Sequence, residues 1–165
     1  MRILTLTPQL LAQHRERLVH FSFRYGDKRI THKALRWLQR LPTDQSFPEG
    51  TWMAVALDEE RLAGFILFGQ FGLKEAIVIV HPDHRKKSVG EQLLTLALDR
   101  LDRVYTRVAC DNIPSLKLCF SKGLIAFRLI TGPTGKPTFI LGGGNWSQEE
   151  YDRYSNKMMI SRSSH

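Results

Sequence analysis

The sequence predicts one domain of the α/β (α+β) class, with helices flanking a sheet over residues 1–165. Short strand-like runs alternate along the chain with longer stretches in which apolar residues recur at helical spacing. The length of 165 residues, with 42% hydrophobic and 24% charged residues, fits a single globular domain with its own core. No apolar run is long enough to cross a membrane, and the N-terminus lacks a secretory signal. We therefore expect a cytoplasmic protein without a membrane partner.

The first quarter of the chain is predicted to form a short strand and two helices. "RILTL" at residues 2–6 has the pattern of a strand, and Thr7-Pro8 then supplies an N-cap and a proline for the first helical turn. A second helix is expected over residues 27–41, where apolar residues fall on one face. The link at 21–28, "FSFRYGDK", has two interpretations: a connection anchored in the core, or a loop that binds a ligand.

Three strands and a long helix are expected in the middle of the chain. The strands are "TWMAVAL", "LAGFILFGQF" and "EAIVIV", and "DEER" at 58–61 forms a tight turn between the first two. Pro82 has no N–H to give to a ladder and therefore ends the third strand. The helix that follows begins near Ser88 to Gly90 and has one apolar face.

The last part of the chain is predicted to contain a strand at 103–110, a short helix at 112–123 and a final hairpin made by "IAFRLI" and "PTFILG". The tail from about residue 145 opens with Ser147 and Glu150 at the spacing of a capping box. It is expected to form a short helix before a frayed "SRSSH" end. Three aromatic residues of this tail are candidates for a homodimer contact: Trp146, Tyr151 and Tyr154.

The junction "VHPDHRKKSVGEQLL", residues 80–94, is the first candidate functional site. Three consecutive basic residues precede its helix: Arg85, Lys86 and Lys87. The first amides of a helix lack internal partners, and Gly90 lets a ligand approach the backbone, so the junction can hold a pyrophosphate. Ser88 and Glu91 also match a capping box, which would occupy the same amides. The residues alone leave both interpretations open.

Two stretches of the chain resemble the motifs of the GNAT acyltransferase superfamily. The first motif, V-x-P-x-x-R-x-x-G-x-G/A, binds acetyl-CoA and is matched by Val80, Pro82, Arg85 and Gly90. Ser88 stands where the family usually has the first glycine of this motif. The second motif, N-x-x-[AS]-x-x-[LF]-Y-x-x-x-G-F, is matched by Asn112, Ser115, Leu118 and Gly123. Cys119 replaces its usual tyrosine and Leu124 its usual phenylalanine. The predicted element order also follows the family, so the resemblance covers roughly residues 2–141.

The resemblance implies a GNAT fold, with a mixed seven-stranded sheet splayed at its centre. It also implies a protein that moves an acetyl group from acetyl-CoA to a primary amine. The pantetheine arm would run along the strand at 77–80, the pyrophosphate would lie on residues 85–90, and the thioester would lie beside the start of the helix at 112–123. The implied cofactor-binding residues are Val78, Ile79, Val80, Arg85, Lys86, Lys87, Ser88, Val89, Gly90, Asn112 and Ser115.

Two catalytic residues are also implied by the resemblance, and each has a structural alternative. Cys119 stands in place of the tyrosine that protonates the leaving thiolate; the alternative is that it packs on the buried face of its helix. Glu75 opens the strand that leads to Val80, where the family often has a carboxylate that accepts the ammonium proton through water. The alternative for Glu75 is a solvated turn residue.

The charge distribution bears on the partners of the protein. The net charge is +8, and residues 1–45 hold nine basic and three acidic residues. Such a field attracts anions, so the amine acceptor, a small molecule or a protein, is expected to carry negative charge elsewhere. Cys110 and Cys119 have no zinc-site spacing, and no metal is expected.

Two other functions remain as alternatives. The first is a non-catalytic acyl-CoA-binding regulatory module of the same fold, which the departures at Cys119 and Leu124 favour. The second is a nucleic-acid-binding domain. It is the weaker alternative because the chain has no evident helix-turn-helix, zinc module or RNP-like aromatic pattern.

Overall fold

The computed structural model describes residues 1–163, and the chain divides into two compact units between Leu101 and Asp102. Seven β-strands and five α-helices occur in the described part of the chain, so the predicted α/β (α+β) class is confirmed. That the chain forms a single domain stays a prediction.

The first unit contains β1 (Arg2–Thr5), α1 (Pro8–Tyr25), α2 (His32–Arg40), β2 (Trp52–Asp58), β3 (Arg61–Gly69), η1 (Gln70–Gly72), β4 (Glu75–Val80), η2 (Pro82–His84) and α3 (Val89–Leu101). The second contains β5 (Arg103–Ala109), α4 (Ile113–Ser121), β6 (Ile125–Thr131), β7 (Pro137–Gly144) and α5 (Gln148–Ser163). The strands form a four-stranded sheet of order β1-β2-β3-β4 and a three-stranded sheet of order β5-β7-β6.

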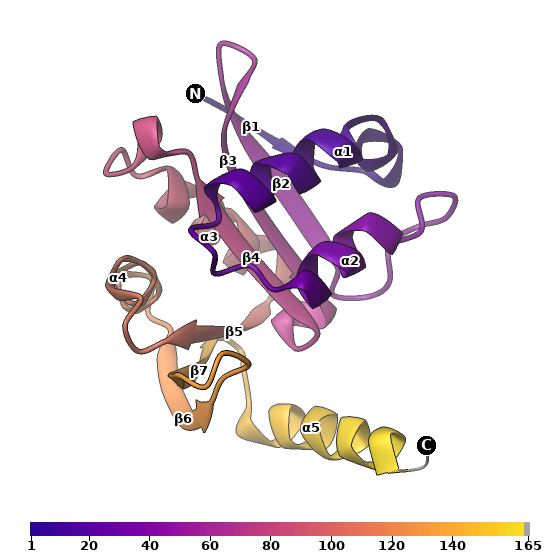
Figure 1. The fold of residues 1–165 in the computed structure, drawn as a ribbon, viewed down its shortest axis with the longest axis vertical. Helices are drawn as coiled ribbons and strands as arrows, with labels where there is room; N and C mark the ends of the chain where they lie inside the picture. Colours follow the sequence, from indigo (N-terminus) through magenta and orange to yellow (C-terminus); the bar gives the residue numbers. More distant parts are fainter. Residues whose placement is uncertain (164–165) are drawn as a thin grey trace. The chain divides into compact units, whose positions relative to one another are not determined.

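The sheet of the first unit is antiparallel throughout and has helices on both faces. In Figure 1, α1 and α2 cover one face and α3 lies on the other. Because side chains alternate along a strand, every second residue of β2, β3 and β4 enters the core under α1 and α2. The buried strand residues of this core are Met53, Val55, Leu57, Phe65, Leu67, Ile77 and Ile79. On the other face, a Cβ at Gly64 would lie 2.9 Å from Val89, so this glycine lets the start of α3 approach the sheet closely.

The boundaries of α1 and α2 differ from the prediction. The segment at 21–25, predicted to be part of a link, is the last part of α1, because Phe21 is buried and packs edge-on against Tyr25 one turn later. α2 begins at His32 rather than near residue 27, since the Thr31 side chain caps it by accepting a hydrogen bond from the Ala34 amide at 3.0 Å. The connection between the two helices is therefore shifted along the chain, to residues 26–31.

The second unit is an antiparallel three-stranded sheet joined to α5. The capping box predicted for the tail is supported by the Glu150 amide, which donates to the Ser147 hydroxyl at 3.1 Å. Trp146 lies over Gly142 and stacks on Phe127, with ring centroids 4.7 Å apart. The helix is longer than predicted, because it includes residues 161–163 of the segment expected to fray. The remainder of that segment lies outside the described residues.

Candidate active site

The turn between β4 and α3 is ordered by its own hydrogen bonds. Pro82 follows the last strand residues and begins η2, and the amides of His84 and Arg85 donate back to the carbonyls of His81 and Pro82 at 2.8 and 3.4 Å. The Asp83 amide donates to His81 Nδ1 at 3.1 Å. The turn therefore has a defined shape before any ligand is considered.

Arg85, the arginine of the first motif, joins this turn to the end of α1. Its Nε donates to the Val80 carbonyl at 3.2 Å, and its Nη2 lies 3.0 Å from the Asp27 carboxylate. The same Nη2 is 3.5 Å from the Tyr25 carbonyl. The guanidinium remains partly exposed, so it can reach an anion only in competition with Asp27.

Left-handed backbone conformations occur at Lys86 and Ser88, each with a φ of 63°. Ser88 is the residue that replaces the usual glycine, and its φ lies in the region that glycine adopts without steric cost. The Gln92 amide donates to the Ser88 carbonyl at 3.0 Å, so α3 starts here. An N-cap residue normally has an extended backbone, and within residues 1–163 the Ser88 hydroxyl has no hydrogen-bond partner. The geometry of Ser88 thus differs from that of a capping box.

A second polar contact fixes this turn to the β2–β3 hairpin. His84 Nε2 lies 2.9 Å from the Asp58 carboxylate, and the His84 side chain is largely buried. The hydrogen bond to His84 lowers the pKa of Asp58, and the nearby charge of Lys87 acts in the same direction. The negative charge of Asp58 is therefore held at the base of a turn that is otherwise basic.

The strand β4 leads into the turn and is an edge strand of its four-stranded sheet. One side of its backbone is consequently outside the ladder with β3. Ile79 is buried under α1 and α2, whereas Val78 and Val80 are half-buried on the other face. Glu75 opens the strand and is also half-buried, opposite Gly69, whose missing side chain leaves room for the Trp37 ring.

The residues of the second motif all belong to the second unit, in α4 or next to its two ends. Asn112 precedes the helix and makes no side-chain capping bond, and both Asn112 and Ser115 are half-buried. Cys119 is 7% exposed, and burial raises the pKa of its thiol to about 11. A thiol in this state stays protonated near neutral pH. The predicted site residues on β4 and in the turn after it thus belong to the first unit, and those in and beside α4 belong to the second. Within each unit, the structure brings its own predicted residues together.

Sequence reasoning missed several residues around the turn between β4 and α3. Asp27, Tyr25 and Asp58 contact the turn from elements far away in the chain. Asp27 follows Gly26 in the segment at 21–28, for which the sequence left both a core-anchored connection and a ligand-binding loop open, and it has a positive φ of 54°. In the sequence, the one indication that residues near Asp27 contribute to the site was the grouping of aromatic and charged residues at 21–28.

The chain belongs to the acetyltransferase (GNAT) family, whose model matches residues 14–120. It is a GNAT-type N-acetyltransferase that takes the acetyl group from acetyl-CoA, and the family implies an amine as the acceptor. The prediction of the family, the activity and the cofactor is therefore confirmed. No curated protein matches the chain.

Several solved structures share the fold. A Vibrio cholerae spermidine N-acetyltransferase SpeG chimera with hSSAT is similar at 14% identity and a TM-score of 0.67, over 94% of this chain and 99% of the other. A ribosomal-protein-alanine N-acetyltransferase from Brucella melitensis is similar at 16% identity and a TM-score of 0.64, over 87% of this chain and 99% of the other. These identities support the GNAT fold and carry no information on the acceptor. None of the helices within residues 1–163 is long and apolar enough to span a membrane.

Proposed function

We propose that the pyrophosphate of acetyl-CoA binds to the turn between β4 and α3, on residues 85–90. The left-handed conformations of Lys86 and Ser88, directly before the first amides of α3, are the main support. A helix N-terminus favours an anion, and three consecutive cations stand beside it. Gly90 is half-buried and adds no side chain where the phosphates would approach. The donor groups of this turn therefore fit a pyrophosphate.

The rest of the cofactor would use the remaining predicted residues. The unpaired side of β4 at Val78, Ile79 and Val80 offers backbone groups to the pantetheine amides. Asn112 and Ser115 at the start of α4 present polar side chains for the thioester end. When bound, acetyl-CoA supplies the activated acetyl group, and the protein has to position it and an amine.

Glu75 is the proposed base for the acceptor amine. Its half-buried position disagrees with a fully solvated turn residue. The burial of Cys119 supports packing rather than proton donation. A thiol with a pKa of about 11 gives its proton unfavourably to a thiolate whose own pKa is near the ordinary value of about 8.5.

The acceptor is proposed to be a primary amine on a molecule that carries negative charge elsewhere. Basic residues dominate α1, α2 and the loop between them, and such a field attracts anionic carriers. A polyamine of the kind named for the Vibrio cholerae enzyme would be repelled by the same field. The protein acceptor named for the Brucella melitensis enzyme is compatible with it only if the accepting segment is acidic.

A homodimer in the cytoplasm is the proposed state of the protein. The two cysteines are free, as is usual in a reducing compartment. Tyr151 is 6% exposed and packs against Phe127, so it serves its own unit rather than a partner. The exposed Met159 and Ile160 on α5 are better candidates for a subunit contact. A spermidine N-acetyltransferase of the same fold is described as dodecameric.

Calorimetric titration of CoA tests the proposed pyrophosphate site. Arg85→Ala should weaken CoA binding by about tenfold, because it removes a cation and a bond that shapes the turn. Arg100→Ala, at the far end of α3, removes the same charge and should leave the affinity within about twofold. Equal effects of the two variants would contradict the site and indicate a general charge effect. A panel of amines, neutral, cationic and acidic, then ranks the acceptors by kcat/KM.

A further inference from the structure

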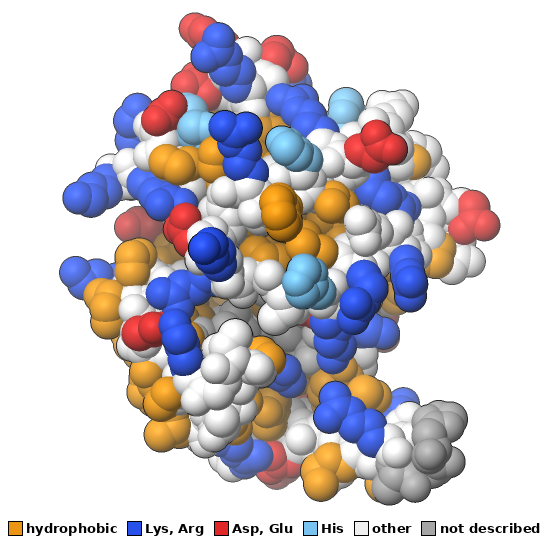
Figure 2. All heavy atoms as spheres, viewed as in Figure 1, with side chains coloured by type: hydrophobic (Ala, Val, Ile, Leu, Met, Phe, Trp, Pro, Cys, Tyr) orange, Lys and Arg blue, Asp and Glu red, His pale blue; other side chains and the backbone are white. Residues whose placement is uncertain are grey.

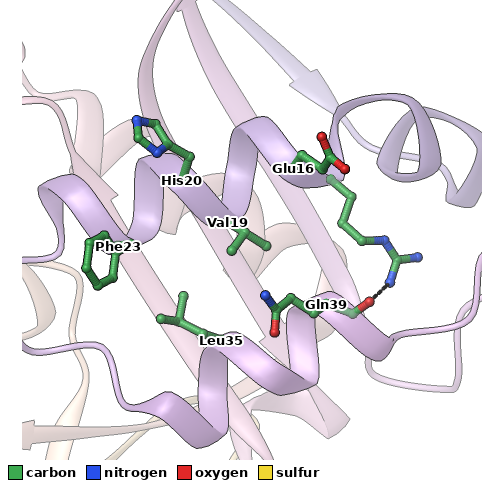
Figure 3. A pocket seen from close by; sticks show the side chains of 7 residues that line it. Glu16, Val19, His20, Phe23, Leu35 and Gln39 are labelled. Atoms are coloured by element: carbon green, nitrogen blue, oxygen red, sulfur yellow. Dashed lines mark hydrogen bonds between the residues drawn. The ribbon is translucent and has the colours of Figure 1, made fainter.

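The outer surface of α1 and α2 carries a groove of about 550 Å³. Figure 3 shows Val19, Phe23 and Leu35 forming its apolar part, with Glu16, His20 and Gln39 at its edge. Phe23 is 70% exposed, an unusual position for a phenylalanine on a helix whose other face is already buried. The groove is lined only by α1 and α2, and no residue of the turn between β4 and α3 contributes to it.

Arg15 holds the two helices in a fixed relation along this groove. Its guanidinium donates to the carbonyls of Leu38 at 3.3 Å and Leu41 at 2.6 Å, and also to that of Gln39. These carbonyls are the unsatisfied acceptors at the C-terminal end of α2. The groove is therefore a stable feature of the surface, and Arg15 is occupied in maintaining it.

A row of positive charge lies on α2, the helix that also supplies Leu35 and Gln39 to the groove. Lys33, Arg36 and Arg40 are exposed and follow one another at helical spacing on one side of α2, which contains no acidic residue. Within residues 1–163, none of these three side chains has an ion-pair partner. Figure 2 shows apolar side chains over α1 and α2, with lysine and arginine side chains around them. Apolar and basic groups thus form one surface.

We propose that this surface docks an acidic polypeptide segment, with one apolar side chain in the groove and its carboxylates on Lys33, Arg36 and Arg40. The groove residues and these three cations are called the α1–α2 surface below. The groove is large enough to take a leucine or aromatic side chain, and the cations supply the complementary charge. Docking here is separate from the acetyl donor site and is independent of the proposed binding of the pyrophosphate.

A polypeptide fits the α1–α2 surface better than a nucleic acid does. Glu16 at the edge of the groove can accept hydrogen bonds from peptide amides, which a phosphate backbone does not offer. Gln39 offers both donors and acceptors for the same purpose. A single exposed ring, Phe23, provides an apolar contact but no series of stacking platforms for successive bases.

Fluorescence anisotropy with a labelled synthetic peptide, several glutamates around one central phenylalanine, tests the proposal. The full chain should bind it saturably, and more weakly as salt increases. Lys33→Glu combined with Arg36→Glu should weaken binding by about tenfold or more. The matched control, Lys117→Glu with Lys157→Glu, makes the same charge change on exposed residues of α4 and α5 and should cost less than about threefold. Phe23→Ala should weaken binding about fivefold with an unchanged salt dependence.

Three results would overturn the proposal. One is the absence of saturable binding to the wild-type protein. Another is an equal loss in the charge-reversed variant and its control, which would indicate attraction by net charge alone. The third is tighter binding of a single-stranded oligonucleotide of equal charge, which would make the α1–α2 surface a nucleic-acid site. Because acetyl transfer is not the readout, these outcomes do not depend on the proposed cofactor site or acceptor.

Discussion

The Asp27 carboxylate lies 3.0 Å from the guanidinium of Arg85, the arginine of the cofactor motif. The pair connects the loop after α1 with the turn that precedes α3, and 58 positions of sequence separate the two residues. Both side chains are substantially exposed, at 63% for Asp27 and 42% for Arg85. An ion pair this exposed contributes little to folding, so its main consequence is competition with any anion that approaches Arg85.

Asp27→Asn should therefore tighten the binding of CoA, by about two- to fivefold at low salt. The substitution removes the charge that competes for Arg85 while keeping the size of the side chain. Calorimetry at low and high salt measures the effect, which should shrink as salt screens the pair. Asp44→Asn removes the same charge from a loop residue outside the turn and serves as the control. Unchanged or weaker binding in Asp27→Asn would show that the carboxylate does not compete with the cofactor.

Ser88→Gly should stabilise the protein and improve the binding of CoA. A non-glycine residue in the left-handed region costs about 1–2 kcal/mol, and the extra freedom of glycine in the unfolded chain offsets about half of this. We expect a net gain of about 0.5–1 kcal/mol in the free energy of unfolding, measured by urea denaturation. Loss of the side chain also opens the approach to the amides of α3.

Ser88→Ala separates the two effects. Alanine also removes the hydroxyl but retains the left-handed strain, so it should give no gain in stability. An equal loss of stability in Ser88→Gly and in Ser88→Ala would show that the hydroxyl, rather than the backbone conformation, is the important feature of Ser88.

Local signals in the sequence predicted most of the elements. The cap at Thr7, which accepts a bond from the Leu10 amide at 3.2 Å, and the capping box of α5 depend on residues a few positions apart. The "DEER" turn is also confirmed, with Glu59 and Glu60 both at positive φ although neither is a glycine. Each of these features is determined within a short stretch of chain, which is why it could be recognised without a structure.

Contacts between distant stretches could not be predicted in the same way. Tyr25 and Asp27 meet Arg85 because α1 continues to Tyr25, and the aromatic run at 21–25 hid this continuation. The exposed Phe23 interrupts the apolar periodicity that would have marked the end of α1. Whether the Cys119 thiol is buried likewise depends on which parts of the chain pack against one side of α4. The motif residues were thus predicted, whereas the side chains that control their charge required the three-dimensional structure.

Cys119 should react much more slowly with iodoacetamide than Cys110 at pH 8. With a pKa of about 11, about one Cys119 in a thousand is a thiolate at this pH, and the side chain is also buried. Cys110 is less buried and provides the internal comparison. Mass spectrometry of the modified peptides measures both rates. Rapid labelling of Cys119 in the folded protein would contradict the buried, protonated state.

Because the Cys119 thiol is buried and protonated, we expect Cys119→Ala to retain acetyltransferase activity. We expect kcat within about threefold of the wild type, with a loss of about 1–2 kcal/mol in stability from the small cavity. Cys119→Ser, which keeps a proton donor, is the companion variant. A fall in kcat of about a hundredfold in Cys119→Ala, restored by Cys119→Ser in folded protein, would assign proton donation to this position.

Glu150→Gln should destabilise the second unit in a pH-dependent way. Glu150 accepts two hydrogen bonds from Arg103, at 2.7 and 2.8 Å, and one from the Tyr105 hydroxyl at 2.7 Å. The bonds from Arg103, followed by the one from Tyr105, hold the pKa of Glu150 below its usual value of 4.5. Removal of its charge leaves Arg103 without this bidentate partner, so we expect a loss of about 2 kcal/mol at pH 7.

The sign of the pH dependence follows from the lowered pKa. The folded state binds the Glu150 proton more weakly than the unfolded state does, so the ionised carboxylate contributes its full stabilisation above about pH 4.5. This contribution is lost as the pH falls through the lower folded pKa, and the difference between wild type and Glu150→Gln should shrink over the same range. Thermal unfolding between pH 3 and 7 measures it, with Glu149→Gln, an exposed neighbour on the same helix, as the control. A difference that stayed constant over this range would show that packing, rather than the charge of Glu150, joins α5 to β5.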